Sequence, residues 1–397
     1  MKSLLKFSFL LCILKSMNYW MLWYTNTRIV YLLTLLLIII CVSNKQIDWK
    51  KKINGNYIVG FVFFAIFAIL QNYTVLANKT SLLSYSNTFL LLGIFYAVLR
   101  LGDKFKEELV GFVEKSMIYL LVPALIVFFA NFFVNLPYIP AVYMDSFGNE
   151  PYGLLKNYIF LIHHADAIAD LASFPRFCGP FLEPGQLATF LSFLLLLLKF
   201  DFSKKSRYVL LVALLVSFSL AGYVLALMGA LLVKSHKMKK LLPLVSLLVI
   251  VYLVGINYNN GDNLLNKYIL VRLEYDEEKG ISGNDRSSAI ADKIFEEELM
   301  VNSKNFLFGL PHYRGEAIGG SGYKFYLINY GFFNLIFLLL SYIVISGNAK
   351  NKRDMLIFLV LIIASFLQRA TPLIFYIPFM YFFALDNNKQ QLTVTRK

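Results

Sequence analysis

Long stretches of apolar residues recur along the whole chain and are separated by polar segments. A helix needs about 20 mainly apolar residues to cross the hydrocarbon core of a bilayer. From this pattern we expect an all-α protein with about twelve membrane-crossing helices. The predicted ranges are 5–24, 28–43, 57–75, 83–100, 116–136, 184–199, 206–219, 222–233, 239–256, 323–346, 353–370 and 372–385.

Several predicted spans are too short to cross a membrane in a straight line. The pair 206–219 and 222–233 is the extreme case, because only a small polar break near Gly222 divides it. Irregular backbone at membrane depth is tolerated only where protein buries it or where it lines a wet cavity. We therefore expect tilted, broken or re-entrant helices here, or close helix packing through the small residues of the break.

Composition agrees with an integral membrane protein. The 397 residues are 58% hydrophobic and 16% charged, and the mean hydropathy is +0.62. A soluble domain is about 45–50% apolar and about 25% charged, so an ordinary soluble enzyme and a disordered chain are excluded. The cysteines Cys12, Cys41 and Cys178 are scattered and form no zinc-binding or disulfide pattern.

The net charge of +14 comes with Lys and Arg residues gathered in alternate loops. Cytoplasmic loops of membrane proteins carry this excess, so nucleic acid is not expected as a partner. With the N-terminus inside, the short outer loops hold only Arg28 and Lys79. Both termini are therefore predicted to be cytoplasmic.

Two long loops fall on the outer side in this topology, where a rigid helical scaffold can carry function. In the first, the amphipathic stretch from Tyr158 to Ala172 is expected at the membrane interface. In the second, 287–300 combines the apolar residues Ile290, Ile294 and Leu299 with three consecutive acidic residues and is expected to be a surface helix. The chain then divides into N-terminal helices 1–136, a first outer loop 137–183, central helices 184–256, a large outer loop 257–322, and C-terminal helices with a cytoplasmic tail 323–397.

The first candidate site is the segment from Arg176 to Gln186, where the first long loop enters the span at 184–199. Arg176 and Glu183 flank a Gly–Pro turn, and Pro184 suits the first turn of a helix. Ionisable groups at a membrane edge are costly and favour a functional charge pair. The alternative is that Glu183 only starts the helix, where its charge suits the helix dipole.

The second candidate site is in the large outer loop. Arg286 and Arg314 bracket the predicted surface helix, and arginine matches phosphate geometry with two parallel hydrogen bonds. His312 is a candidate base near neutral pH. Arg369, at the outer end of the span at 353–370, is either a third cation for this site or a snorkelling anchor. The alternative for Arg286, Arg314 and His312 is an ordinary solvated loop position.

A metal site is not expected. His163, His164, Asp166 and Asp170 gather in the first loop. Adjacent histidines do not face each other on a helix, and no further ligand spacing completes a site.

The order of these features resembles a known family. The chain has a long outer loop, R-x-x-G-x-x-x-E-P-G from Arg176 to Gly185, an apolar span, and a serine-rich tight hairpin from Ser217 to Tyr223. A large outer loop with Arg286 follows, then F-G-L from Phe308 to Leu310. This order is similar to that of the bacterial O-antigen and capsular polysaccharide polymerases (Wzy type) of the O-antigen ligase/polymerase superfamily. It covers about the C-terminal 60% of the chain.

The resemblance implies a GT-C-like glycosyltransferase of the bacterial inner membrane, acting at its outer face without a metal or cofactor. Such an enzyme moves a growing glycan from undecaprenyl diphosphate to the non-reducing end of an incoming lipid-linked repeat unit. Expected partners are this lipid-linked oligosaccharide, the bilayer and a chain-length regulator protein.

The residue chemistry suits that reaction. Arginines can stabilise the departing diphosphate, with Arg176 and Arg286 as the first candidates and Arg314 and Arg369 as weaker ones. Glu183 is the first candidate for the general base and His312 the second. Glu183 could instead orient Arg176. Tyrosines of the outer loops could stack on sugars, although interface anchoring is the simpler explanation. These tyrosines are Tyr138, Tyr152, Tyr313 and Tyr323.

Two other functions stay open. An O-antigen ligase would use the same donor but transfer the glycan to lipid A–core. A transporter or lipid-linked glycan flippase would suit twelve spans, but transporters usually have related halves and charges near the midplane. Here the candidate charges are at the outer edge.

Overall fold

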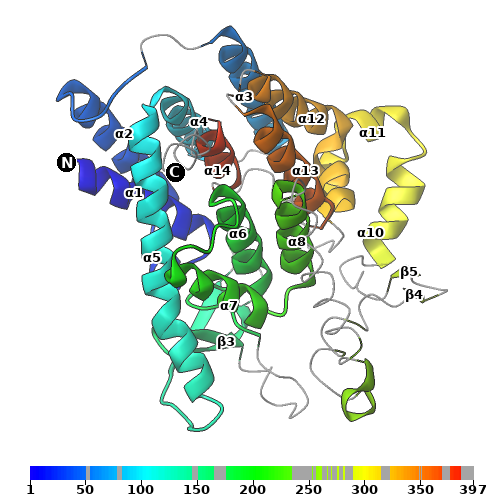
Figure 1. Ribbon diagram of the computed structural model, residues 1–397. Coiled ribbons are helices and arrows are strands. Elements are labelled where there is room, and N and C mark those ends of the chain that lie inside the picture. Colours follow the sequence, from blue (N-terminus) through cyan, green and yellow to red (C-terminus); the bar gives the residue numbers. More distant parts are fainter. Residues whose placement is uncertain are drawn as a thin grey trace. The chain divides into compact units, whose positions relative to one another are not determined.

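The computed structural model is mostly helical (Figure 1). It describes residues 1–50, 54–77, 83–144, 151–164, 176–234, 253, 256–261, 266, 270, 275–276, 280–281, 289–313, 322–347, 349, 351–368 and 376–385.

The principal helices follow the apolar ranges of the sequence. They are α1 (Lys2–Ser16), α2 (Thr27–Ser43), α3 (Gly55–Ala77), α4 (Leu83–Arg100), α5 (Asp103–Ala130), α6 (Pro184–Leu197), α7 (Tyr208–Val216), α8 (Leu220–Lys234), α10 (Ala289–Ile294), α11 (Ser303–Phe308), α12 (Gly322–Ser346), α13 (Lys352–Gln368) and α14 (Tyr376–Ala384). Short turns of other helix types are η1 (Trp20–Leu22), η3 (Lys205–Arg207), η5 (Tyr258–Gly261), the π-type turn η8 (Phe295–Leu299) and η9 (Pro311–Tyr313).

Strands occur in the two long loops. The antiparallel order β1-β2-β3 joins β1 (Ile139–Met144), β2 (Pro151–Asn157) and β3 (Ile162–His164). A second pair joins β4 (Tyr275–Asp276) to β5 (Gly280–Ile281). The predicted amphipathic stretch from Tyr158 therefore begins with a bend and strand β3, and its residues 165–172 lie outside the described residues.

Among the described residues, α5 and α12 are long and apolar enough to cross a membrane. Shorter apolar helices coincide with most other predicted spans. The range 239–256 lies almost wholly outside the described residues.

The first predicted span, 5–24, is not one helix. Helix α1 ends at Ser16, and Asn18 has a φ of 53°, in the left-handed region where a right-handed helix cannot continue. The indole of Trp23 donates to the carbonyl of Asn18 (2.8 Å) and fixes this turn. Apolar composition continues across the break, so the hydropathy pattern alone did not reveal it.

The chain forms two compact units. The first contains Met1–Ser16, Tyr24–Lys115 and Ala289–Lys397, and the second contains Met17–Trp23 and Ser116–Ser288. In the first unit α12 packs along α3, and the amide of Asn334 donates to the carbonyl of Phe67 (3.0 Å). This hydrogen bond joins the two helices, and it offsets the free-energy cost of burying the polar amide.

The centre of the second unit is α6, which is buried along nearly its whole length and packs against α7 and α8. A small cluster of Leu155, Ile162, Cys178 and Leu182 joins the sheet to the segment that precedes α6. The indoles of Trp20 and Trp23 pack on this cluster. The sheet thereby holds the start of α6 in place.

Candidate functional site

The segment from Arg176 to Leu182 is attached on two sides within the second unit. Arg176 Nε donates to the carbonyl of Ser217 (3.2 Å), and Phe177 N donates to that of Val216 (3.1 Å). On the other side, Ile162 N donates to the carbonyl of Gly179 (2.9 Å). Gly179 has a φ of +58°, so the turn suits glycine. The arginine is therefore held against the end of α7 by backbone bonds.

Glu183 is the N-cap residue of α6, and Pro184 is its first residue, as the sequence predicts. The Glu183 carboxylate does not cap the helix by a side-chain hydrogen bond, although its backbone carbonyl accepts from Leu187 N (3.2 Å). The side chain is half-buried and lies at the positive end of the helix dipole. Glu183 is thus both a helix-start residue and a carboxylate that is not used for capping.

Cys178 lies between these two charges. Burial raises the pKa of its thiol to about 12, while the nearby Arg176 charge lowers that pKa and the Glu183 charge raises it, both as smaller effects. Its Sγ donates to the carbonyl of Ile162 (2.7 Å). Cys178 is therefore a neutral, packed thiol, and a thiolate nucleophile at this position is not supported.

The break between α7 and α8 lies directly against this segment. Ser217 is fully buried, its Oγ donates to the carbonyl of Leu214 (2.6 Å), and Phe218 has a φ of 45°. A Cβ on Gly222 would collide with Ala188 of α6, and Ser192 Oγ donates to the Gly222 carbonyl (2.9 Å). The small residues of the break allow α8 to approach α6 closely, one of the two alternatives that the sequence left open.

A second cluster, in the first unit, combines Glu298, His312 and Tyr313. Tyr313 Oη donates to Glu298 Oε1 (2.6 Å), and His312 Nε2 lies 3.7 Å from Glu298 Oε2. The rings of His312 and Tyr313 are 4.2 Å apart. The His312 side chain is 61% exposed and that of Glu298 is 43% exposed, so the cluster is open to solvent.

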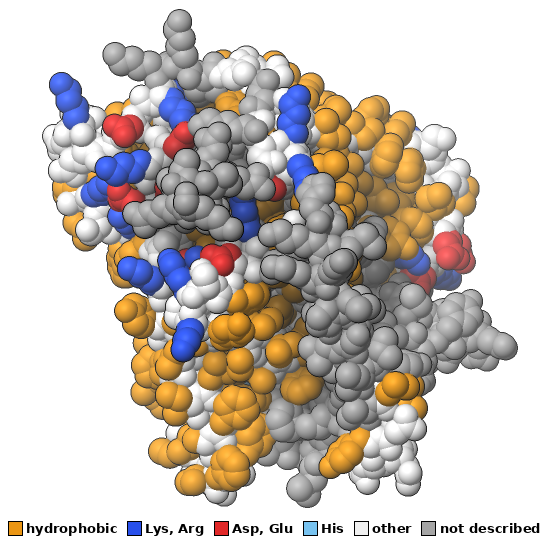
Figure 2. Space-filling view, in the orientation of Figure 1, with side chains coloured by type: hydrophobic (Ala, Val, Ile, Leu, Met, Phe, Trp, Pro, Cys, Tyr) orange, Lys and Arg blue, Asp and Glu red, His pale blue; other side chains and the backbone are white. Residues whose placement is uncertain are grey.

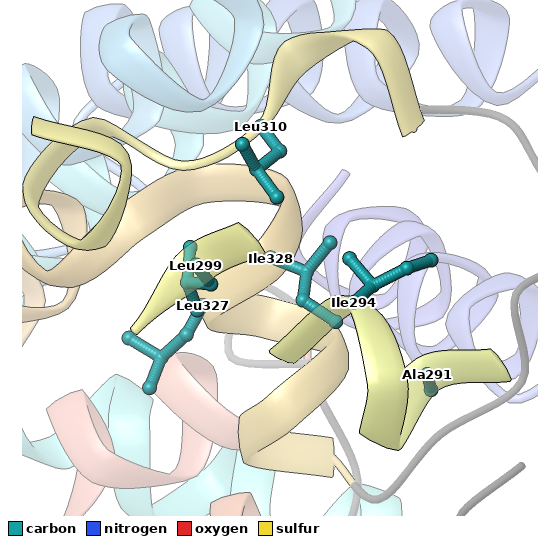
Figure 3. Packing of buried hydrophobic residues seen from close by; sticks show 6 residues of the cluster. All are labelled: Ala291, Ile294, Leu299, Leu310, Leu327 and Ile328. Atoms are coloured by element: carbon teal, nitrogen blue, oxygen red, sulfur yellow. The ribbon is translucent and has the colours of Figure 1, made fainter. Parts of the chain in front are cut away.

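A group of buried apolar side chains packs next to the cluster of Glu298, His312 and Tyr313. Residues of α10 and η8 pack with Leu310 on the first turns of α12, as Figure 3 shows for Ala291, Ile294, Leu299, Leu310, Leu327 and Ile328. The predicted helix over 287–300 is present from Ala289 onward. Of its apolar residues, Ala291, Ile294 and Leu299 are buried, whereas Ile290 is 65% exposed.

The F-G-L sequence fits into a kink of α12. Gly309 has a φ of +79°, and Gly331 breaks α12 with a φ of 76° and a ψ of 172°. Leu310 N donates to the carbonyl of Ile328 (2.6 Å), and a Cβ on Gly309 would lie 2.8 Å from Gly331 N. Two glycines from separate parts of the chain thus let two backbones touch.

Tyr323 and Lys324 complete the support of the second cluster. The Tyr323 ring meets Phe295 edge-on, at 6.1 Å between centroids, and Lys324 Nζ pairs with Asp292 (2.6 Å). Tyr323 contributes packing here, whereas Tyr313 is bonded through its hydroxyl to Glu298.

Other predicted residues are placed as follows. His163 is 3% exposed and lies edge-on to the rings of Phe128 and Tyr158. In the part of the chain that the structure describes, no three His, Cys, Asp or Glu side chains are grouped to hold a metal ion. The predicted cations Arg286, Arg314 and Arg369 lie outside the described residues.

Comparison of the chain with protein-family models, with curated proteins and with solved structures finds no match. The motifs of the sequence and the chemistry of the two clusters are therefore what points to a function. Glu298 is not among the site residues predicted from the sequence, where it is the last of three consecutive acidic residues. Among these three acidic residues, Glu298 is the one that directly precedes Leu299, which is buried.

Proposed function

We propose that the protein is a polysaccharide polymerase of the bacterial inner membrane. In this proposal it has about twelve membrane-crossing helices, a GT-C-like arrangement, cytoplasmic termini and both long loops on the outer side. It transfers a growing glycan from undecaprenyl diphosphate to an incoming lipid-linked repeat unit. A chain-length regulator would be a further partner.

One contact supports this proposal most directly. The hydrogen bond from Arg176 Nε to the Ser217 carbonyl (3.2 Å) joins the R-x-x-G-x-x-x-E-P-G segment to the serine-rich break. These are two of the motifs on which the family resemblance depends, and they are 41 residues apart in sequence. Motifs that serve one site are expected to meet in space.

The reaction needs a cation and a base. A hydroxyl of the acceptor sugar attacks the anomeric carbon of the donor glycan, and the bond from that carbon to the diphosphate oxygen breaks. The negative charge that grows on the departing lipid diphosphate is stabilised by guanidinium groups, which stay protonated at any physiological pH. Arg176 is the proposed cation here, together with Arg286 and, less directly, Arg314 and Arg369.

The proton of the attacking hydroxyl must pass to a base within hydrogen-bond reach. Glu183 is the first candidate, because it belongs to the same segment as Arg176 and its carboxylate does not cap α6. His312 is the second candidate, because its Nε2 lies 3.7 Å from Glu298 Oε2, and this carboxylate can orient the ring. Tyr313 and Tyr323 are proposed to border the sugar-binding surface.

The proposal is tested with the full chain, purified in detergent and given only undecaprenyl-diphosphate-linked repeat units. The wild type should form a ladder of products. Arg176→Ala should lower the rate by about 10²–10³-fold, the usual cost of removing one group that stabilises transition-state charge. Lys204→Ala, an exposed change in another loop, is the control and should leave the ladder intact.

Complementation distinguishes the ligase. In a host that lacks the gene, a polymerase defect leaves single repeat units on the surface glycan, and Arg286→Ala should fail to restore the ladder. Loss of all surface repeats with accumulation of lipid-linked polymer would identify a ligase instead. A wild-type protein that makes no product from any lipid-linked repeat unit, with or without lipid A–core, would refute both.

A further inference from the structure

One side of α5 in the second unit carries a continuous row of exposed apolar side chains. Tyr119, Val122, Ile126 and Phe129 are 76%, 38%, 64% and 44% exposed. Their spacing of three and four residues places them on one face of the helix. The opposite face, with Leu121 and Phe128 among others, is completely buried.

This row does not stop where the helix stops. Phe133, Val134 and Ile139 are 87%, 59% and 57% exposed, and they lead into strand β1. From Ser116 to Met144 the chain has no charged residue. Hydrophobic side chains dominate the lower part of α5 in Figure 2.

The length of the charge-free part of α5 explains why the apolar surface continues beyond the end of the helix. From Ser116 to Ala130 the helix rises about 22 Å at 1.5 Å per residue. The hydrocarbon core of a bilayer is about 30 Å thick. The charge-free part of α5 is therefore too short to cross it upright, and the apolar residues after Ala130 can cover the remainder.

The backbone beyond the helix is suited to the edge of a membrane. Phe133 N and Val134 N both donate to the carbonyl of Ala130 (3.0 Å each), and β1 pairs with β2. These bonds lower the cost of contact with lipid, and the other edge of β1, which is an edge strand of the sheet, suits the lipid–water interface, where water can satisfy its backbone groups. Lys156 Nζ lies 4.9 Å from the centre of the Tyr138 ring, so a cation and a tyrosine border the apolar row. Both residue types are common at membrane interfaces.

We propose that this α5–β1 apolar surface contacts lipid along α5, and that its residues after Ala130 lie in the outer leaflet of the bilayer, so that β1 lies at the lipid–water interface and not free in the outer compartment. We define the surface as Tyr119, Val122, Ile126, Phe129, Phe133 and Ile139. Lipid is favoured over a partner helix, because close helix pairing in membranes uses small residues and this face carries bulky ones. The inference goes beyond the proposed function and does not depend on the reaction.

Site-directed fluorescence in lipid nanodiscs tests this proposal. The full chain with C12S and C41S retains only the buried Cys178, to which Phe133→Cys or Ile139→Cys is added and labelled with bimane. We expect lipids with brominated acyl chains to quench both probes by more than about half, as for groups at or within the hydrocarbon edge. Iodide, which stays in water, should quench them weakly.

Two matched positions calibrate the experiment. Ile126→Cys, in the middle of the charge-free helix, should be quenched by brominated lipid, and Ser206→Cys, in an exposed loop, by iodide. Strong iodide quenching at Phe133 and Ile139 would overturn the proposal, because the surface would then face water. Protection from both quenchers would also overturn it, because protein, such as a second copy of the chain, would then cover the surface.

Discussion

At the scale of single residues, the chain uses charges in two different ways. Arg176 donates from its Nε to a backbone carbonyl, that of Ser217 (3.2 Å). Glu298, in contrast, approaches two other polar side chains, Tyr313 and His312. The bond to backbone fixes the position of the guanidinium, and the shared carboxylate orients its two neighbours.

Glu298→Gln tests whether this carboxylate matters to the proposed reaction. A neutral amide keeps the size of the side chain but removes the negative charge that lies beside Tyr313 and His312. We expect the maximal rate of polymerisation to fall by about 10–100-fold, because these two side chains lose the carboxylate that orients them. Glu296→Gln, on an exposed residue of the same turn, is the matched control. Equal activity of the two variants at all pH values would exclude a role for Glu298.

The carboxylate of Asp201 makes the free energy of unfolding depend on pH in a predictable direction. The backbone amide of Ser203 lowers the pKa of Asp201 below its ordinary 3.8, and the Ser203 hydroxyl and Arg207 add to this. A lowered folded-state pKa stabilises the fold above the unfolded pKa, and this contribution is lost as the pH falls through the folded pKa.

Asp201→Asn should therefore lower the free energy of unfolding by about 1 kcal/mol at pH 7, because buried Arg207 loses a charged partner while water screens the half-exposed carboxylate. Thermal unfolding in detergent from pH 7 to pH 3 measures this. The difference from wild type should stay constant down to about pH 4 and shrink below it. A difference that grows at low pH would contradict the assignment.

At the scale of elements, glycine positions decide where helices bend and touch. Gly309 and Gly331 both combine a positive φ with an extended ψ, a region that is essentially restricted to glycine. A Cβ on Gly331 would also meet the carbonyl oxygen of Leu307. The kink in α12 and the F-G-L turn therefore depend on each other.

Alanine at Gly309 or Gly331 should each lower the free energy of unfolding by about 2–4 kcal/mol, from backbone strain and steric overlap together. Gly111→Ala in α5 is the control, since a Cβ there meets nothing within 4 Å. That substitution should raise stability by about 0.5–1 kcal/mol, because alanine favours helix. Thermal unfolding of the three variants would contradict this account if all changed stability alike.

At the scale of the whole molecule, the segments of the two units alternate along the chain, and Lys and Arg residues gather in alternate loops. The loops rich in Lys and Arg predict a cytoplasmic side, and the two long loops predict an outer one. Two helices of the described chain have the length and composition to cross a membrane. The complete topology is a prediction from the charge pattern, and it can be measured directly.

Reporter fusions at three positions test this topology. Alkaline phosphatase, which is active only outside the cytoplasm, should be active when fused after Tyr138 and inactive when fused after Lys205. Green fluorescent protein at the C-terminus should fluoresce, because it matures in the cytoplasm. Active phosphatase at Lys205 would refute the predicted orientation of the central helices.

The sequence by itself determined the features that depend on neighbouring residues. Apolar runs located most of the helices, Pro184 marked the first residue of α6, and the polar break near Gly222 separated α7 from α8. The helix from Ala289 was also predictable from its periodicity. These features follow from local composition, because a helix is defined by hydrogen bonds within a few residues.

The tertiary structure alone decided which distant residues meet. Arg176 contacts Ser217, Asn334 contacts Phe67, and Gly309 fits against Gly331, although nothing in the local pattern of either partner specifies the other. The sheet in the first long loop also required pairing across turns. Such contacts arise when buried backbone and polar groups must each find a partner, and that requirement is satisfied by the packing of the whole fold.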